Sequence, residues 1–253
     1  MSKGERSRSL AVQIGFFVVF FALWWIESLA GWINPVIFPH LPDVLTAFGR
    51  VITTKETLGA LGTTLSTFAL AYGGAIVAGI GVGYLVSSSR LFTKTYEPVL
   101  AAIYTIPLII FFPTFLLFFG IGVKSKIALG FAAAFFPIAL NTIAGFTSVD
   151  DRLRTAALTF GATRAQMLRR VLFPGAFGII LTGLRIAFIP CFASVLAGEI
   201  IASTSGLGHE ISYSAAMMEP ARMFAYVFLG IIVAALFNFG LTTWEARRAH
   251  ITA

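Results

Sequence analysis

Residues 176–201 read AFGIILTGLRIAFIPCFASVLAGEII, an apolar run that holds only two charged residues, Arg185 and Glu199. An α-helix rises about 1.5 Å per residue, so about twenty apolar residues are needed to cross the hydrocarbon core of a membrane. The run is longer than that. It therefore predicts a membrane-spanning helix, and the same test can be applied to the rest of the chain.

The composition of the whole chain agrees with this interpretation. Of its 253 residues, 58% are hydrophobic and 11% are charged, whereas about a quarter of the residues in a soluble domain are charged. Apolar runs of spanning length occur at about residues 10–32, 63–86, 99–119, 127–146, 176–201 and 223–243. We therefore expect an all-α integral membrane protein, a single domain of residues 1–253 with six transmembrane helices.

Lysine and arginine are unevenly distributed between the connecting segments, and cytoplasmic segments retain positive charge. With the N-terminus inside, the inner segments hold twelve basic residues and the outer segments five. The inner set is Lys3, Arg6, Arg8, Arg90, Lys94, Arg152, Arg154, Arg164, Arg169, Arg170, Arg247 and Arg248; the outer set is Arg50, Lys55, Lys124, Lys126 and Arg222. Both termini are therefore predicted to be cytoplasmic. Because these residues are dispersed at span ends, the net charge of +7 does not indicate nucleic-acid binding.

The first apolar run follows basic residues, a pattern that also fits a secretory signal peptide. Its length exceeds the usual run of about 7–15 residues in such peptides. Glu27 and the tryptophans at positions 24, 25 and 32 suit an interfacial anchor better. We expect the segment to be retained as the first span.

Residues 33–62 follow this span and contain three prolines and then a helical stripe. Apolar residues at positions 44, 45, 48, 51 and 52 have the spacing of one helix face. We expect this helix to lie along the outer membrane surface.

Small residues and prolines interrupt the spans. Ala75, Gly79 and Gly83 recur at four-residue spacing, which lets two helix backbones approach closely. The neighbouring helix can belong to this chain or to a second copy. Prolines within the spans, Pro107, Pro113, Pro137 and Pro190, would bend the helices, as happens both in gated paths and in static bundles.

Residues 150–174, between the fourth and fifth spans, carry helical signals of their own. A short helix can begin at Asp150 or Asp151, and its apolar positions 153, 157 and 160 share one face. Gly161 can end it in the left-handed conformation. The segment Thr163-Arg164-Ala165-Gln166 then offers a capping box for a second helix. Helix, break, helix is therefore predicted, and by itself such a segment can be a membrane-surface helix, a rigid loop or a knob for a partner's groove.

Ionisable residues inside spans are costly and indicate function. Arg185 and Glu199 are 14 residues apart, which places them within about 40° on one helix face and about 21 Å apart along the axis. They can mark the two ends of a solute-facing stripe. Alternatively, Arg185 snorkels inward and Glu199 lies in the outer interface. Asn141 is a weaker pathway candidate, because an intramembrane Asn more often bonds a neighbouring helix.

Sequence signatures of catalysis and of metal binding are missing. Lys124-Ser125 follows glycines at the wrong spacing for a phosphate-binding loop. The three histidines lie in separate segments, and Cys191 is the sole cysteine. No catalytic residue, cofactor or metal site is therefore predicted on this chain.

The insert at 150–174 resembles the signature of ABC-importer permeases: Glu-Ala-Ala, three residues, Gly, nine residues, Ile-x-Leu-Pro. Four positions match, namely Ala156, Ala157, Gly161 and Pro174, and three depart, namely Thr155, Val171 and Phe173. Thr155 removes the carboxylate of the family motif, so an ion pair from that position to the ATPase subunit cannot be assumed. The resemblance implies a cytoplasmic coupling helix that meets the ATPase, with the motif positions Thr155, Ala156, Ala157, Gly161 and Pro174. To these we add Phe160, as an apolar knob held at a fixed angle by the Gly161 break, and the basic Arg164.

Further segments resemble the sulfonate, taurine and nitrate branch of these permeases. They are Tyr104-Thr105-Ile106-Pro107, Phe118-Phe119-Gly120-Ile121-Gly122, Phe136-Pro137-Ile138-Ala139-Leu140-Asn141-Thr142, Gly183-Leu184-Arg185, Gly198-Glu199 and Gly206-Leu207-Gly208. The resemblance implies a type I importer of the bacterial inner membrane. It would contain two permease copies, two cytoplasmic ATPase subunits that bind ATP and Mg²⁺, and an extracytoplasmic solute-binding protein.

The function expected from this resemblance is alternating-access import of a small polar, anionic solute, with Arg185, Glu199 and Asn141 as pathway candidates. Related permeases also serve pyrimidine vitamin precursors, so the same architecture for such a solute is an alternative. A secondary transporter and a membrane scaffold are rivals from other classes.

Overall fold

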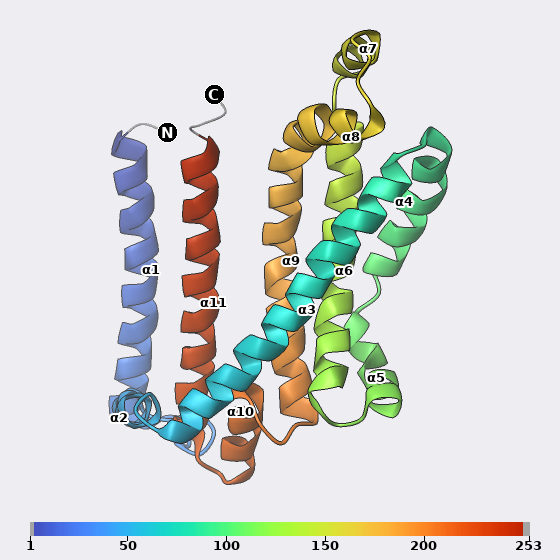
Figure 1. The fold of residues 1–253 in the computed structure, drawn as a ribbon. Helices are drawn as coiled ribbons and strands as arrows, with labels where there is room; N and C mark the ends of the chain where they lie inside the picture. Colours follow the sequence, from blue (N-terminus) through green and yellow to red (C-terminus); the bar gives the residue numbers. More distant parts are fainter. Residues whose placement is uncertain (1–2, 250–253) are drawn as a thin grey trace. The chain divides into compact units, whose positions relative to one another are not determined.

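The protein is described here by a computed structural model that covers residues 3–249, and over them the chain is helical (Figure 1). The helices are α1 (Lys3–Ala30), α2 (Leu41–Val51), α3 (Lys55–Ser87), α4 (Arg90–Tyr104), α5 (Phe112–Phe119), α6 (Val123–Thr147), α7 (Asp151–Thr159), α8 (Arg164–Met167), α9 (Phe173–Ile201), α10 (Leu207–Ala216) and α11 (Pro220–Ala249). A 3₁₀ turn, Leu108–Phe111, precedes α5, and a π-helical turn, Leu168–Leu172, joins α8 to α9. The two chain ends, residues 1–2 and 250–253, lie outside the described residues, so their cytoplasmic location stays a prediction.

Five helical stretches of the described chain are long and apolar enough to cross a membrane. They are Ala11–Ala30, Lys55–Ser87, Val123–Thr147, Arg164–Ile201 and Pro220–Gly240. A sixth span exists if Arg90–Tyr104 and Leu108–Phe119 are counted as one, although these two are bent by 78° at the break between them. The chain is thus an all-helical membrane protein with five or six candidate spans.

The bend interrupts the predicted third span at Pro107. Proline lacks a backbone N–H and disfavours helical conformation in the residue before it. The helix α4 ends at Tyr104, and the N–H groups of Thr105 and Ile106 still bond to its last carbonyl groups. Pro107 is extended, with ψ of 99°, and helical structure resumes at Leu108. The proline therefore breaks the helix completely.

The chain divides into two compact units. One comprises the residues up to Leu58 together with Glu210–Gly230, and the other comprises Gly59–His209 and the residues from Ile231 on. Both units draw on segments far apart in the sequence.

In the larger unit, small residues let α3 lie close against α6. A Cβ atom added to Gly79 would lie 2.8 Å from Cγ2 of Ile138, and one added to Gly83 would lie 2.5 Å from Cβ of Thr142. Ala75 is fully buried. The small-residue track therefore packs within this chain, which decides an alternative that the sequence left open.

The smaller unit is built around Trp24. Its indole Nε1 donates a hydrogen bond to the carbonyl oxygen of Pro39 at 3.0 Å. The rings and aliphatic side chains that pack with it are Phe38, Leu41, Val44, Phe224 and Phe228. The predicted helix after the first span is present as α2, whose Leu41, Val44 and Val51 are buried, while Leu45 and the residue after the helix, Ile52, are exposed. An exposed apolar face suits a helix on a membrane surface.

We expect Gly83→Ala to destabilise the protein, because the added methyl group has no room beside Thr142 and overpacking typically costs about 1–3 kcal/mol. Thermal unfolding in detergent should show a lower Tm for this variant. Gly81→Ala is the matched control on the same helix, since nothing lies within 4 Å of the added Cβ. Equal Tm values for the two variants would contradict the packing.

Candidate functional site

The insert between α6 and α9 has the predicted local structure. The Asp150 side chain caps α7 by accepting a hydrogen bond from the Arg152 N–H at 2.8 Å. At the other end Gly161 has φ of +74°, and the N–H groups of Gly161 and Ala162 bond to the carbonyls of Leu158 and Ala157. This is the Schellman arrangement that ends many helices.

A second helix begins directly after this break. The Thr163 hydroxyl accepts a hydrogen bond from the Gln166 N–H at 3.3 Å, while the Gln166 side chain accepts one from the Thr163 N–H at 2.9 Å. The predicted capping box is therefore present. Because both sides of the break are fixed by hydrogen bonds, α7 is held at a defined angle to α8.

The end of α7 presents large apolar side chains to its surroundings. Phe160 is 90% exposed, Leu158 is 64% exposed and Leu153 is 56% exposed. Leu158 is a residue that the sequence interpretation did not include. Thr155 is also exposed, and its hydroxyl donates to the Asp151 carbonyl at 2.9 Å. The side chain that replaces the family's carboxylate is thus satisfied inside α7.

Basic residues attach α7 to the helices beside it. The Arg154 guanidinium donates to the Phe146 carbonyl at the end of α6. Asp151 accepts from Arg90 at 3.4 Å, but both side chains are well exposed, and such pairs contribute little. The sequence analysis counted Arg154 only as a positive charge, because its contact with a carbonyl in α6 is tertiary.

The second half of the insert and α9 form one continuous helical stretch, Arg164–Ile201. Val171 packs with Phe146, Val149 and Ile180 in a core at the end of α6 and α9. Pro174 lies inside this continuous stretch, shortly after the π-helical turn Leu168–Leu172, and local π adjustments of this kind accommodate a proline in a spanning helix. Arg164 is exposed in the first turn of α8. A cation in the first turn of a helix interacts unfavourably with the helix dipole. The presence of Arg164 at this position is therefore not explained by the stability of α8.

The two charged residues of α9 lie in different environments. Arg185 is exposed, whereas Glu199 is only 2% exposed. The Glu199 carboxylate accepts hydrogen bonds from the Thr64 hydroxyl, at 2.8 and 3.0 Å, and from the Gly208 N–H at 3.0 Å. The Thr64 oxygen in turn accepts from the Leu207 N–H at 2.8 Å. One carboxylate thus joins α3, α9 and the start of α10.

Glycines make room for this buried carboxylate. Gly206 has φ of +108°, and a Cβ atom on Gly206 or Gly208 would collide with Glu199. Lys126 is also buried; its ammonium donates to the carbonyls of Ile121 and Gly122, and its side chain packs against Gly198. The sequence analysis had counted Lys126 among the loop charges. The motif Gly206-Leu207-Gly208 was the sequence signal that pointed to hydrogen bonding around Glu199. It did not indicate that Thr64 is the partner of Glu199 on another helix.

A cavity of about 430 Å³ lies beside the break between α4 and α5. It is lined by Tyr104, Ile106, Leu108 and Ile109 on one side, and by Ala133, Pro190, Ala193, Ser194 and Ala197 on the other. Asn141 lies elsewhere: its amide donates to the Pro137 carbonyl at 2.8 Å, and its side chain fills the space beside Gly183. Of the predicted pathway residues, none lines this cavity.

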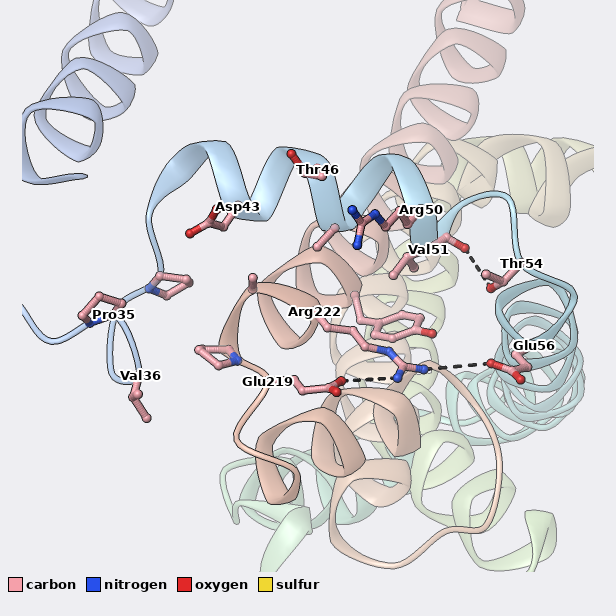
Figure 2. A pocket seen from close by; sticks show the side chains of 15 residues that line it. Pro35, Val36, Asp43, Thr46, Arg50, Val51, Thr54, Glu56, Glu219 and Arg222 are labelled. Carbon is pink, nitrogen blue, oxygen red and sulfur yellow. Dashed lines mark hydrogen bonds and ion pairs between the residues drawn. The ribbon is translucent and has the colours of Figure 1, made fainter. Parts of the chain in front are cut away.

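A second cavity, of about 840 Å³, lies in the smaller unit between α2, the start of α3 and the start of α11 (Figure 2). The guanidinium of Arg222 reaches Glu219 at 3.3 Å, Glu210 at 3.6 Å and Glu56 at 4.0 Å. It also lies 5.8 Å from the ring centroid of Tyr226. Arg222 therefore connects three segments of this unit.

Asp43 and Arg50 line the same cavity and form no ion pair with any described residue (Figure 2). A lining with this many charges is too costly for the hydrocarbon region. The cavity is therefore expected at a membrane surface, and the outer position of α2 stays a prediction.

Comparisons with known proteins agree with this arrangement. A family model described as "Binding-protein-dependent transport system inner membrane component" matches residues 75–247. The taurine transport system permease protein TauC of Escherichia coli is 31% identical over 246 residues, which cover 95% of this chain and 90% of that protein. The formylaminopyrimidine transport permease protein ThiX of Halalkalibacterium halodurans is 30% identical over 217 residues, 85% of each chain.

Solved structures are similar in fold. An inward-facing structure of the MetNI methionine ABC transporter matches with a TM-score of 0.65 at 22% identity, over 76% of this chain and 95% of that chain. Together with the family match over most of the chain, this accounts for the helical membrane architecture. The chain belongs to the family of binding-protein-dependent transport system inner membrane components: it is a multi-pass inner-membrane subunit of an ABC importer, without a cofactor of its own, in which ATP is hydrolysed on a separate subunit.

Proposed function

We propose that this subunit is one of two permease copies, most simply a homodimer, in an importer with two cytoplasmic ATP-binding subunits and an extracytoplasmic solute-binding protein. Each copy forms a single transmembrane domain with six spans and cytoplasmic termini, counting α4 and α5 as one broken span. Closure of the ATP-binding subunits displaces α7 and turns the solute path outward by alternating access.

The exposed apolar end of α7 is the observation that carries the coupling role. An exposed Leu158 in the last turn of α7 and an exposed Phe160 at its C-cap, on a helix capped at both ends, are explained by a groove on a partner protein. Gly161 sets the angle of the helix, and Arg164 offers a charge that the fold itself does not need. Ala156 and Ala157 keep the helix narrow enough to enter a groove.

The coupling contact is proposed to be apolar, because Thr155 cannot supply the ion pair of the family motif. Its hydroxyl is engaged within α7. The basic residues on and after α7 support a cytoplasmic position for this segment, by the inside-positive rule. The segment after the first span, which holds α2 and its charged cavity, is proposed to face outward from the distribution of Lys and Arg along the sequence, on the side where a solute-binding protein docks.

The proposed solute is small, polar and anionic, of the sulfonate, taurine or nitrate type. The near full-length similarity to a taurine permease and the exposed cation of Arg185 support this choice. A pyrimidine vitamin precursor is the second candidate, because ThiX is almost equally similar. Adding the cognate binding protein loaded with taurine or with formylaminopyrimidine, and measuring which one raises ATP hydrolysis, separates the two.

Glu199 is proposed to anchor the outer loop after α9 and not to line the path. Its carboxylate is buried and receives hydrogen bonds from two other segments, so it is not available to a passing solute. The packing of Asn141 against Gly183 favours a structural role for that residue too.

The family match argues against a secondary transporter, the rival class that the sequence left open, although such proteins also use broken helices and alternating access. A secondary transporter would move solute with purified permease alone, driven by an ion gradient. ATP hydrolysis that depends on assembly with this chain argues against it.

Gly161→Val should uncouple ATP hydrolysis from transport. A β-branched residue resists the left-handed region at a cost of about 1–2 kcal/mol, whereas nothing lies within 4 Å of an added Cβ at this position. The effect is therefore conformational. Gly161→Asn, which tolerates positive φ, is the control and should keep transport. Normal transport and normal stimulation by the binding protein in Gly161→Val complexes would show that the coupling assignment is wrong.

Arg185→Met should lower transport several-fold while assembly and basal ATP hydrolysis stay nearly intact, because the variant keeps most of the side-chain length but removes the charge. Uptake into proteoliposomes is the measurement, and Arg185→Lys should retain most of it. Loss of assembly would instead indicate a structural or snorkelling role. Unchanged uptake would exclude Arg185 as a pathway residue.

A further inference from the structure

We infer that the cavity of about 430 Å³ beside the α4–α5 break is a transit site for the solute, and that the small side chains of α9 facing it limit the size of solute that passes. The inference rests on the proposed import function. It assigns the path to residues that the sequence did not suggest for it.

The first observation is the broken helix itself. Non-helical backbone at membrane depth is tolerated only where it is buried in protein or lines a water-filled cavity. Residues 105–107 leave the helix between two halves that together have the length and hydropathy of one span. Tyr104, Ile106 and Leu108, on both sides of this break, line the cavity. Discontinuous helices of this kind form the substrate sites of many transporters.

The second observation concerns two hydroxyl groups. Ser194 and Tyr104 line the cavity, and neither hydroxyl has a hydrogen-bond partner among the described residues. Other hydroxyls in these helices behave differently: Thr182 donates to the Gly178 carbonyl, and Thr142 donates to the Ile138 carbonyl. Two accessible hydroxyls that have no partner in the described part of the chain, on residues of an otherwise apolar lining, can bond a polar solute or the water that accompanies it.

The third observation is the size and charge of the lining. On α9 the cavity is faced by Pro190, Ala193, Ser194 and Ala197, and no charged side chain takes part. Ligand pockets commonly enclose about 300–1,000 Å³, so one compact solute fits. Without a charged group the site binds weakly, as transport requires. Arg185 lies about 80° around α9 from Ala193, outside the lining.

The test is to fill the cavity. Ala193→Leu and Ala197→Leu should each reduce uptake by about tenfold or more, equivalent to ~1.4 kcal/mol on the barrier. ATP hydrolysis stimulated by the loaded binding protein should persist in both. Ala193→Ser should keep most uptake because it adds little volume. Ala235→Leu adds the same bulk to an exposed position of α11 and should leave uptake unchanged.

Unchanged uptake in both leucine variants would overturn the inference. So would a loss of assembly confined to these variants, because the cavity would then be covered by the second permease copy. If the leucine variants do not fold, the variant Ala193→Cys tests the inference instead. After assembly it should react with a charged thiol reagent from the aqueous phase and lose uptake, while the native Cys191 is buried. Lack of reaction would overturn the inference as well.

The proposed function is tested separately by the unmodified protein. If the wild-type complex shows no uptake that depends on ATP and the binding protein, the importer assignment fails whatever the variants do. If the wild type transports and the filled variants transport equally well, only the transit site fails.

Discussion

A membrane interior offers no water to pair with peptide N–H and C=O groups, so a spanning chain must satisfy them within helices. At three places near a span where this chain is not helical, particular residues remove or hydrogen-bond the backbone N–H groups that the helix no longer pairs. Pro107 removes an N–H at the break between α4 and α5. Gly161 and the Thr163–Gln166 box satisfy the backbone on both sides of the turn after α7. The Glu199 carboxylate receives the first N–H groups of α10, in part through Thr64. The two features to which we assign transport roles, namely the transit cavity and the coupling end, lie at the first two of these departures, and the third anchors the loop after α9.

Close packing connects the departures to one another within the larger unit. Glycines allow α3 to lie against α6, and α6 packs along α9, with Gly130 against Val195 and Gly183 against Asn141. Residues Arg164–Ile201 form one helical stretch from the capping box to the Glu199 network, including a π turn. A displacement at α7 can therefore be carried along α9 to the small residues that face the cavity. In the proposed importer, this stretch is the route between the ATP-binding partner and the proposed transit site.

The sequence was sufficient where the determining signals are local. The cap at Asp150, the left-handed Gly161 and the capping box at Thr163 all depend on residues within a few positions of one another, and each is present in the structure. Span positions follow from hydropathy for the same reason, although hydropathy alone could not distinguish a bend at Pro107 from a complete break.

Contacts between distant segments could not be predicted in this way. Glu199 was recognised as an unusual intramembrane charge, but its hydrogen bond to Thr64 joins residues 135 positions apart. Whether a buried carboxylate faces the solute or anchors a loop depends on its hydrogen-bond partners, and the sequence around Glu199 does not identify them. Likewise, Ser194 could be identified as a candidate transit residue only from the cavity that its side chain lines. That cavity is formed by α4, α6 and α9 together, so the sequence near Ser194 does not reveal it.

The central claim is that the apolar end of α7 contacts the ATP-binding subunit. Replacing Phe160 with a photoreactive phenylalanine analogue in the assembled complex, with Ile14 of α1 as an exposed apolar control position, tests it directly. The predicted result is a crosslink from position 160 to the ATP-binding subunit and none from position 14. Crosslinks from position 160 to lipid alone would contradict the claim and assign α7 to the membrane surface.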